Sequence, residues 1–388
     1  MVMFIRTVHK STLQTFGLVA AIVFSAFVML KWSSAAATGV SRGLSICTSV
    51  IIPSLFPFLV LAGFLVKSGI SAAMGRRLGK LTQFLFGLPG CCAAAILISF
   101  IGGYPAGGIA IGEMVKKGEI SRQDGRRLLQ FCVNGGPAFI ISAVGAGMMG
   151  SVGYGVILFS AHILASLVIG ISGRFTSKIK KTVITPDNFT VIKPEKTPAP
   201  TAFVESVNSA CRSLLYMCGF IVLFAALLSL ADATGFSRLF QELLSKLLAV
   251  TGLDTRAFSS VFPCIMEVSC GCVEASRCGP FAPVMLGMAL GWGGLSVHCQ
   301  LASVLYKQKL ITKRFFAARA MQALLGGLFT LILYNYIPMP ITASVSTDHA
   351  IIQPYSGSVV SAVALLAVCT MLLLVTNKQG KAKFTLEK

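Results

Sequence analysis

The sequence contains few charged residues, and acidic residues are the scarcest of them. Only 12% of its 388 residues are charged, with 13 Asp and Glu against 33 Lys and Arg. About a quarter of the residues of an ordinary soluble domain are charged, so this composition excludes a soluble globule of the same length. Because 55% of the residues are hydrophobic and apolar runs reach membrane-spanning length, we predict an all-α polytopic membrane protein.

The sequence also lacks the short motifs of common enzyme classes. It has no His-Glu-x-x-His, Gly-x-Ser-x-Gly or Gly-x-x-x-x-Gly-Lys pattern. Four cysteines lie close together, but their spacing fits no common zinc pattern and no His is near them; they are Cys264, Cys270, Cys272 and Cys278. We therefore expect no enzymatic activity, no catalytic residue, no metal site and no cofactor, with a coupling proton or Na+ as the one candidate.

Basic residues give the chain a formal net charge of +20. Such an excess can indicate nucleic-acid binding, but here Lys and Arg lie in short loops between apolar runs rather than along one helical face. That distribution is typical of the positive-inside bias of membrane proteins and of contact with anionic lipids. The expected partners are a lipid bilayer, including anionic lipids, and a small-molecule substrate, without nucleic acid; a homo-oligomer is left open.

Eight apolar runs are long enough to cross a bilayer core of about 30 Å. They comprise residues 13–30, 44–66, 131–149, 154–171, 211–231, 281–301, 316–337 and 355–376. The basic loops place both the N-terminus and the C-terminal tail in the cytoplasm. A cleaved signal peptide is the alternative for the first run, because Ala35-Ala36-Ala37 would supply a small-residue cleavage site.

Two further apolar segments are predicted to be re-entrant hairpins. Residues 84–111 are broken at Gly102-Gly103-Tyr104-Pro105 and carry basic residues on both flanks, so both ends lie on one side of the membrane. Residues 258–276 form the second broken segment. Irregular backbone at membrane depth is tolerated only where it is buried in protein or lines a wet cavity. Each hairpin tip should therefore meet a polar pocket.

The hairpins belong to a duplication. Residues 53–88, which include an amphipathic stretch at 70–86, have a counterpart at 219–253 with an amphipathic stretch at 236–250. Each copy contributes three spans, a surface helix and a hairpin, and because three is odd the second copy must be inverted. The predicted divisions are an N-terminal span (1–43), the first repeat (44–173), a cytoplasmic linker (174–205), the inverted second repeat (206–337), and an external loop, last span and basic tail (338–388).

Glu267 and Glu274 are the only acidic residues deep in predicted apolar surroundings. An ionised side chain at a helix centre costs roughly 2.5 to 3.5 kcal/mol on insertion scales, so each needs compensation. We interpret Glu267, beside the break Val268-Ser269-Cys270-Gly271, as a ligand for a substrate polar group, a coupling cation or a proton. A local clamp with Arg277 or backbone donors is the alternative, and for Glu274, one turn from Arg277, that clamp is favoured.

Glycine-rich breaks expose backbone donors in the first half. Gly102-Gly103-Tyr104-Pro105 and Asn134-Gly135-Gly136-Pro137 would start half-helices whose N-termini suit an anion; close helix packing through small residues is the alternative. In the second half residues 293–300 take the place of the Asn134 segment, and Ser296 and Gln300 share a face that could line the pocket. His162, in an apolar span, is expected to make a helix–helix hydrogen bond.

Four of these segments resemble a known family. The matching stretches are Phe100-Ile101-Gly102-Gly103-Tyr104-Pro105-Ala106-Gly107, Gly118-Glu119-Ile120-Ser121, Phe131-Cys132-Val133-Asn134-Gly135-Gly136-Pro137-Ala138-Phe139-Ile140 and Gly293-Gly294-Leu295-Ser296-Val297-His298-Cys299-Gln300. They resemble the YlbJ-type sporulation integral membrane proteins of endospore formers, over nearly the whole chain. That family carries the nucleoside-recognition or Gate domain and is similar to the core of concentrative nucleoside transporters.

The resemblance implies a function and a site. It implies two Gate-like repeats that transport a small polar or anionic molecule by alternating access, with dipicolinic acid moved across the outer forespore membrane of a bacterium during sporulation. The alternatives are a nucleoside or nucleobase permease and a non-transporting scaffold for spore-envelope assembly. In the transporter relatives the hairpins carry the substrate site, which here implies Gly103, Tyr104, Pro105, Asn134, Gly135, Glu267, Ser269, Ser296 and Gln300.

Overall fold

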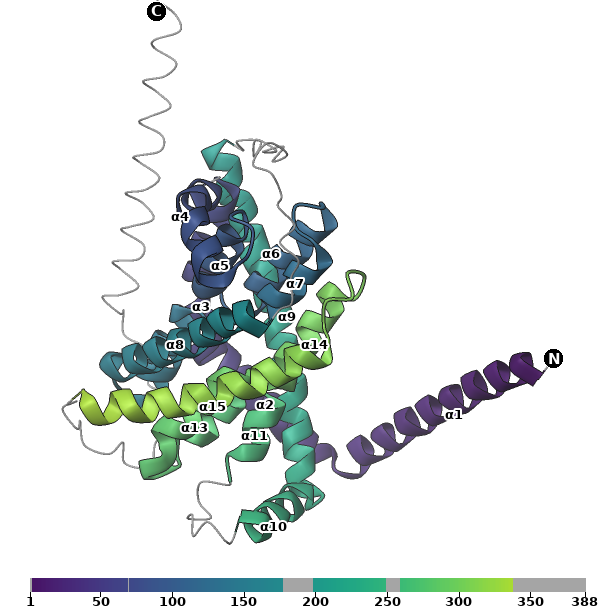
Figure 1. Cartoon of the computed structure of the whole chain (residues 1–388). Coiled ribbons are helices and arrows are strands. Elements are labelled where there is room, and N and C mark those ends of the chain that lie inside the picture. The colour runs from purple at the N-terminus through teal and green to yellow at the C-terminus, as the bar shows by residue number, and fades with distance from the viewer. Residues whose placement is uncertain (1, 69, 177–197, 249–258, 338–388) are drawn as a thin grey trace, which may run out of the picture.

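The described part of the chain is helical. The computed structural model describes residues 2–68, 70–176, 198–248 and 259–337, and every regular element in these ranges is a helix (Figure 1). Five helical stretches are long and apolar enough to cross a membrane: Ser33–Phe64, Val152–Phe175, Ala199–Ala233, Gly279–Leu305 and Lys313–Tyr336. The prediction of an all-α polytopic membrane protein is therefore confirmed.

Three of the eight predicted spans are not among these five stretches. Residues 13–30 lie in α1 (Val2–Lys31), which extends away from the other helices (Figure 1), and residues 355–376 lie outside the described residues. Residues 131–149 differ from a single helix, because 132–136 are not helical and only η2 (Ala138–Met148), a π-type helix, follows. Two glycines and the missing N–H group of Pro137 favour this interruption.

The longest helices of the two halves pack side by side. α2 (Ser33–Ile46) continues through the π-type turn η1 (Cys47–Ile51) into α3 (Ile52–Lys67), and α9 (Ala199–Ala233) lies along them. Small residues allow the close approach, since a Cβ atom on Gly39 would come within 2.6 Å of the Cα atom of Ala226.

Both long helices begin before the predicted division points at 44 and 206. The first starts at Ser33 and α9 starts at Ala199, because the small and polar residues at these starts continue the helices without interruption. The centre of the predicted linker, 177–197, lies outside the described residues. The same holds for the predicted external loop and basic tail.

Both predicted hairpins are formed. α5 (Cys92–Ile101) and α6 (Tyr104–Lys116) are joined by Gly102-Gly103, and α11 (Val261–Met266) and α12 (Val268–Ser276) are joined by Glu267 alone. The two arms of each hairpin pack against each other. At about 1.5 Å per residue, the 10 residues of α5 reach only half-way across a bilayer core. Such short arms fit a re-entrant segment rather than a full span.

A broken helical segment follows each hairpin. After the first, α7 (Arg122–Leu129) is followed by the non-helical residues 132–136 and then η2. After the second, a turn of 3-10 helix leads into α13 (Ala282–Trp292), and α14 (Gly294–Leu305) follows a break at Gly293, whose φ is +80°. The predicted span 281–301 is therefore two half-helices.

Each half then ends in a long helix that packs against the broken segment of the same half. α8 (Val152–Thr176) packs on η2, where a Cβ atom on Gly145 would lie 2.3 Å from the Cα atom of Gly155. α15 (Lys313–Tyr336) packs on α13 in a similar way, through Gly326. α8 and α15 also contact each other, so the two halves share one core (Figure 1).

Two amphipathic helices precede the hairpins, at the places predicted for surface helices. They are α4 (Ile70–Phe86) and α10 (Phe236–Leu248). On α10 the apolar side chains recur every three or four residues and are each more than half exposed; they are Phe236, Leu239, Leu243 and Leu247. An exposed apolar stripe beside charged residues suits the boundary between membrane and water.

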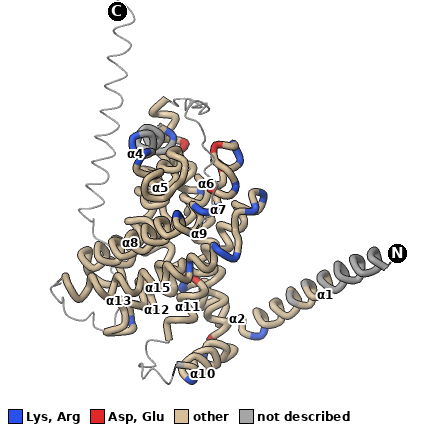
Figure 2. The backbone as a smooth tube through the Cα atoms, viewed as in Figure 1, with Lys and Arg blue, Asp and Glu red and all other residues tan. Residues whose placement is uncertain are grey.

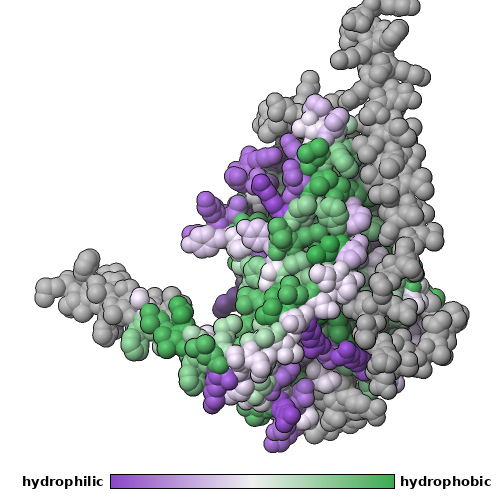
Figure 3. Space-filling view, turned by 180° about the vertical axis from the view of Figure 1, so that it is seen from behind, coloured by the Kyte–Doolittle hydropathy of each residue, from purple (hydrophilic) through white to green (hydrophobic). Residues whose placement is uncertain are grey.

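Basic residues gather at one end of the molecule, around α4 and α7 (Figure 2). Arg127 donates to the carbonyl oxygen of Gly87, at 3.1 Å, and Arg126 donates to that of Lys309, at 3.0 Å. These bonds join α7 to the end of α4 and to the basic segment before α15. Figure 3 shows hydrophobic side chains over much of the face seen from behind. The charge bias favours a cytoplasmic position for the basic end, and the inverted direction of the second repeat stays a prediction.

Candidate functional site

The tip of the first hairpin, Gly102-Gly103, lies against the first break, which is the non-helical stretch 132–136 before η2. Gly103, the residue that caps α6, has a φ of +81°, which favours glycine. A Cβ atom on Gly136 would lie 3.1 Å from the backbone nitrogen of Gly103 and 3.1 Å from the carbonyl oxygen of Ile101. Two segments predicted as separate breaks thus form one contact, and the N-termini of α6 and η2 adjoin.

The tip of the second hairpin, at Glu267, contacts the second break, which is the interruption at Gly293 between α13 and α14. Gly294 has a φ of +77°, and a Cβ atom there would lie 2.8 Å from the backbone nitrogen of Val268 and 3.0 Å from the Cα atom of Glu267. No residue with a side chain fits between these backbones. The N-termini of α12 and α14 therefore also adjoin.

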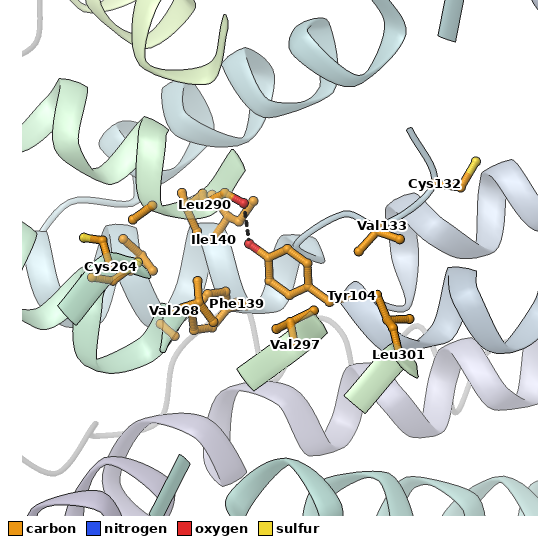
Figure 4. Close-up of a cluster of buried hydrophobic side chains, with 14 of the residues drawn as sticks. Tyr104, Cys132, Val133, Phe139, Ile140, Cys264, Val268, Leu290, Val297 and Leu301 are labelled. Atoms are coloured by element: carbon orange, nitrogen blue, oxygen red, sulfur yellow. Dashed lines mark hydrogen bonds between the residues drawn. The ribbon is translucent and has the colours of Figure 1, made fainter. Parts of the chain in front are cut away.

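Tyr104 connects the two tip-and-break contacts. It is 6% exposed, and its hydroxyl group donates to the carbonyl oxygen of Leu290 at 2.7 Å (Figure 4). Leu290 is in the last turn of α13, where carbonyl groups lack helical partners. The Tyr104 ring packs edge-on against Phe139 and His162, with centroids 6.3 and 6.4 Å away. A residue of the first hairpin thus supports the second break.

Glu267 is buried at the tip of the second hairpin. It is 1% exposed, and its extended backbone lets the carboxylate turn back over the first turn of α12. Oε2 accepts a hydrogen bond from the backbone N–H of Cys270 at 2.7 Å, and Oε1 accepts from the hydroxyl group of Ser296 at 3.4 Å. A carboxylate at a helix N-terminus is also stabilised by the helix dipole. Backbone donors and Ser296, rather than Arg277, provide the compensation that burial requires.

Glu274 has the role that was favoured for it. Its carboxylate lies 3.3 Å from the guanidinium group of Arg277 and also pairs with Arg42 of α2. The side chain is 28% exposed. The clamp is confirmed, and Glu274 stands apart from the buried tip.

A narrow cavity lies where four half-helices begin, namely α6, η2, α12 and α14. Its cavity volume is about 30 Å³, enough for only one or two water molecules. Six residues of the predicted site line it: Gly103, Tyr104, Pro105, Glu267, Ser269 and Gln300. Ser296 reaches it through its bond to Glu267. Within the described ranges, no group of three or more His, Cys, Asp or Glu side chains is arranged to hold a metal ion.

Asn134 and Gly135 do not line this cavity. The Asn134 amide is fully buried, donates to the carbonyl oxygen of Phe131 at 2.8 Å, and accepts from the Gln322 amide at 3.0 Å. The backbone N–H of Gly135 donates to Nε2 of His162 at 3.2 Å. His162 also lies 3.3 Å from the Gln322 amide, so the helix–helix contact predicted for it, between α8 and α15, is confirmed. These residues form hydrogen bonds with the first break on a side that does not line the cavity.

Arg319 is the main residue that sequence reasoning missed. It lies in α15, is 1% exposed, and donates through its two terminal nitrogens to the carbonyl oxygens of Val133 and Gln130. No Asp or Glu of the described ranges forms an ion pair with it. The signal was available, since a charged residue of either sign inside an apolar run such as 316–337 is a functional candidate.

One protein that is similar to this chain is the sporulation integral membrane protein YlbJ of Bacillus subtilis strain 168. The two are 27% identical over 348 residues, which cover 84% of each chain. No family model and no solved structure matches. The match confirms the predicted resemblance to the YlbJ type, and it leaves the nucleoside-recognition domain untested.

Proposed function

We propose that this chain, a relative of the YlbJ-type sporulation integral membrane proteins, is a transporter that moves a small anionic molecule by alternating access. The observation that carries the proposal is the meeting of two hairpin tips with two broken helices around one cavity. Broken helices at membrane depth mark the substrate sites of many secondary transporters, and irregular backbone there needs a polar pocket. A scaffold protein would have no use for such breaks.

Backbone geometry supports an anion as the substrate. The cavity is lined by residues at the start of α6, η2 and α12, and by Val297 and Gln300 further along α14. Each helix N-terminus offers unpaired N–H groups and the positive end of a dipole. At one of these ends the Glu267 carboxylate already occupies the anion position. An incoming carboxylate could use the other two, at the starts of α6 and η2.

Dipicolinic acid fits this description, and we propose it as the substrate. It is a small aromatic dianion, whose ring could stack on Tyr104 and Phe139, both of which line the cavity. The sporulation role of the relative supports a position in the outer forespore membrane. The cavity is too narrow for this molecule as it stands, so the hairpin tips must separate to admit it.

Glu267 would then couple transport to a cation. An ionised carboxylate in the cavity repels a dianion, and at 4 Å this repulsion is several kcal/mol at an effective dielectric of about 20. A proton on Glu267, or a Na+ beside it, removes the repulsion. We propose that one of these cations moves together with the substrate.

Glu267→Gln tests the site, because Gln keeps the shape of the neutral side chain but can neither release a proton nor attract a cation. We expect dipicolinate accumulation in developing spores to fall about 10- to 100-fold, which corresponds to about 1.4–2.7 kcal/mol, because without the coupled cation net uptake loses its driving force. Glu274→Gln is the matched control, since it makes the same change on α12 outside the cavity, and should remain within about twofold of wild type.

Protein levels must be equal in all strains for the comparison to hold. Wild-type accumulation with Glu267→Gln would show that the cavity is not the site. In vesicles that contain the purified protein, uptake of labelled nucleosides but not of dipicolinate would replace the substrate and favour a nucleoside permease. Net uptake that is lost in Glu267→Gln while exchange persists would support the coupling role.

A further inference from the structure

Four buried polar side chains form a cluster behind Tyr104, away from the cavity. They are Asn134, His162, Arg319 and Gln322, contributed by the first break, α8 and α15, and each is at most 2% exposed. Hydrogen bonds connect Gln322 to both Asn134 and His162, and Arg319 to the carbonyl oxygen of Val133, next to Asn134. Three of the side chains are therefore linked directly, and Arg319 joins them through the backbone next to Asn134.

Three polar atoms of this cluster lack a hydrogen-bond partner. Nε of Arg319, Nδ1 of His162 and Oε1 of Gln322 are buried and have no hydrogen-bond partner among the described residues. Because Nε2 of His162 accepts from the Gly135 N–H group, the neutral ring carries its proton on Nδ1, which is then a donor. Buried donors are rarely left unpaired in proteins, and here two are unpaired beside an uncompensated positive charge.

Tyr104 lies between this cluster and the cavity. Its ring lines the cavity and contacts the His162 ring edge-on. A Cβ atom on Gly135 would lie 3.1 Å from the Tyr104 hydroxyl oxygen, so the tyrosine also touches the break that the cluster holds. Among the described residues, Glu267 is the only carboxylate that lines the cavity itself, and no Lys, Arg or His lines it. The positive charge that a dianion needs is therefore behind Tyr104.

We propose that this cluster is a subsite for one carboxylate group of the transported anion, reached when Tyr104 swings aside. The Arg319 guanidinium supplies the positive charge and, through Nε–H, a donor for a carboxylate oxygen, and the Nδ1–H group of His162 is a second donor. The inference rests on the proposed function, because it assigns the substrate a carboxylate. Arg319 is then a specificity residue and not only a brace for the end of α7.

The test is ligand binding to the purified full-length protein in nanodiscs. The probes are dipicolinate, benzoate and the uncharged dimethyl ester of dipicolinic acid. Arg319→Gln should weaken dipicolinate binding at least about tenfold, as loss of a charge-assisted hydrogen bond does, and leave the ester within about twofold. Arg126→Gln is the matched control, because Arg126 also donates to a backbone carbonyl, that of Lys309, but outside the cluster; both affinities should stay unchanged.

Each result decides whether Arg319 binds the substrate or only stabilises the fold. If Arg319→Gln weakens the binding of dipicolinate and of the ester equally, the subsite is refuted and Arg319 only stabilises the backbone at the end of α7. If that variant does not fold, Arg319→Lys decides: a lower ratio of dipicolinate to ester affinity supports the subsite, and an unchanged ratio overturns it. Wild-type protein that binds benzoate through Arg319 but not dipicolinate would refute the proposed substrate alone, and wild-type protein that binds no carboxylate would refute the subsite.

Discussion

Gly294→Ala measures how much the site depends on contact between the second break and the second hairpin tip. The added methyl group would lie 2.8 Å from the backbone nitrogen of Val268, and Gly294 has a φ of +77°. A left-handed conformation costs alanine about 1–2 kcal/mol, and overpacking adds typically about 1–3 kcal/mol. The expected loss of unfolding free energy is therefore about 2–5 kcal/mol. Transport should fall with it, because the tip must shift.

Gly235→Ala is the matched control for this change. Gly235 lies between α9 and α10 with a φ of +79°, and a Cβ atom there would meet nothing within 4 Å. It carries the same conformational cost without the contact, so its expected loss is only about 1–2 kcal/mol. The difference between the two variants isolates the contact of break and tip.

The assay is denaturant unfolding of both variants in the same detergent, together with dipicolinate uptake into vesicles. Gly235→Ala should retain uptake. If the two losses of free energy agree to within about 0.5 kcal/mol, the usual limit of additivity for independent sites, then Gly294 does not support the tip. The arrangement of the four half-helix N-termini would then be wrong as well.

Two further changes test contacts between the halves of the chain. Tyr104→Phe removes the donor to the Leu290 carbonyl oxygen and should lower the free energy of unfolding by about 0.5–1.5 kcal/mol; unchanged thermal unfolding would contradict this bond. Gly39→Ala places a methyl group 2.6 Å from the Cα atom of Ala226 and should cost about 1–3 kcal/mol. Gly219→Ala, on an open face of α9, should instead stabilise by up to about 1 kcal/mol, and equal effects would refute the contact of α2 with α9.

The sequence was sufficient to predict the hairpins, because their signals are local. Basic flanks predict that both ends of residues 84–111 lie on one side of the membrane, and Gly102-Gly103 marks the turn. Glu267 stood out as a rare acidic residue inside an apolar run. Each of these arguments needs only neighbours within a few residues. The structure accordingly places a turn at both positions and buries Glu267.

Which side chains of the two breaks face the cavity could not be predicted in this way. Asn134-Gly135 seemed to be as suited to the cavity as Ser296, but the Asn134 amide bonds to Gln322, which is 188 residues away in sequence. Local periodicity contains no information about such a pairing. Arg319 was missed for a different reason. It lies close to the loop with Lys313 and Arg314 and so resembles a topology signal, although its place inside the apolar run 316–337 already makes it a candidate. Its burial shows that it is not a loop residue.

The two breaks are held by different kinds of contact, and this difference bears on how the cavity can open. Side chains of α8 and α15 hold the first break, through His162, Gln322 and Arg319. The second break is held by close glycine backbone, by the bonds of Ser296 to Glu267 and of Trp292 to the Ile265 carbonyl oxygen, and by the hydroxyl group of Tyr104 from the first hairpin. Any movement that separates the first tip from α13 must therefore break the bond to Leu290 and uncover the cluster behind Tyr104 in the same step. Opening of the cavity and access to the buried positive charge would then be one event, so a substrate that can pair with Arg319 would itself favour the open form.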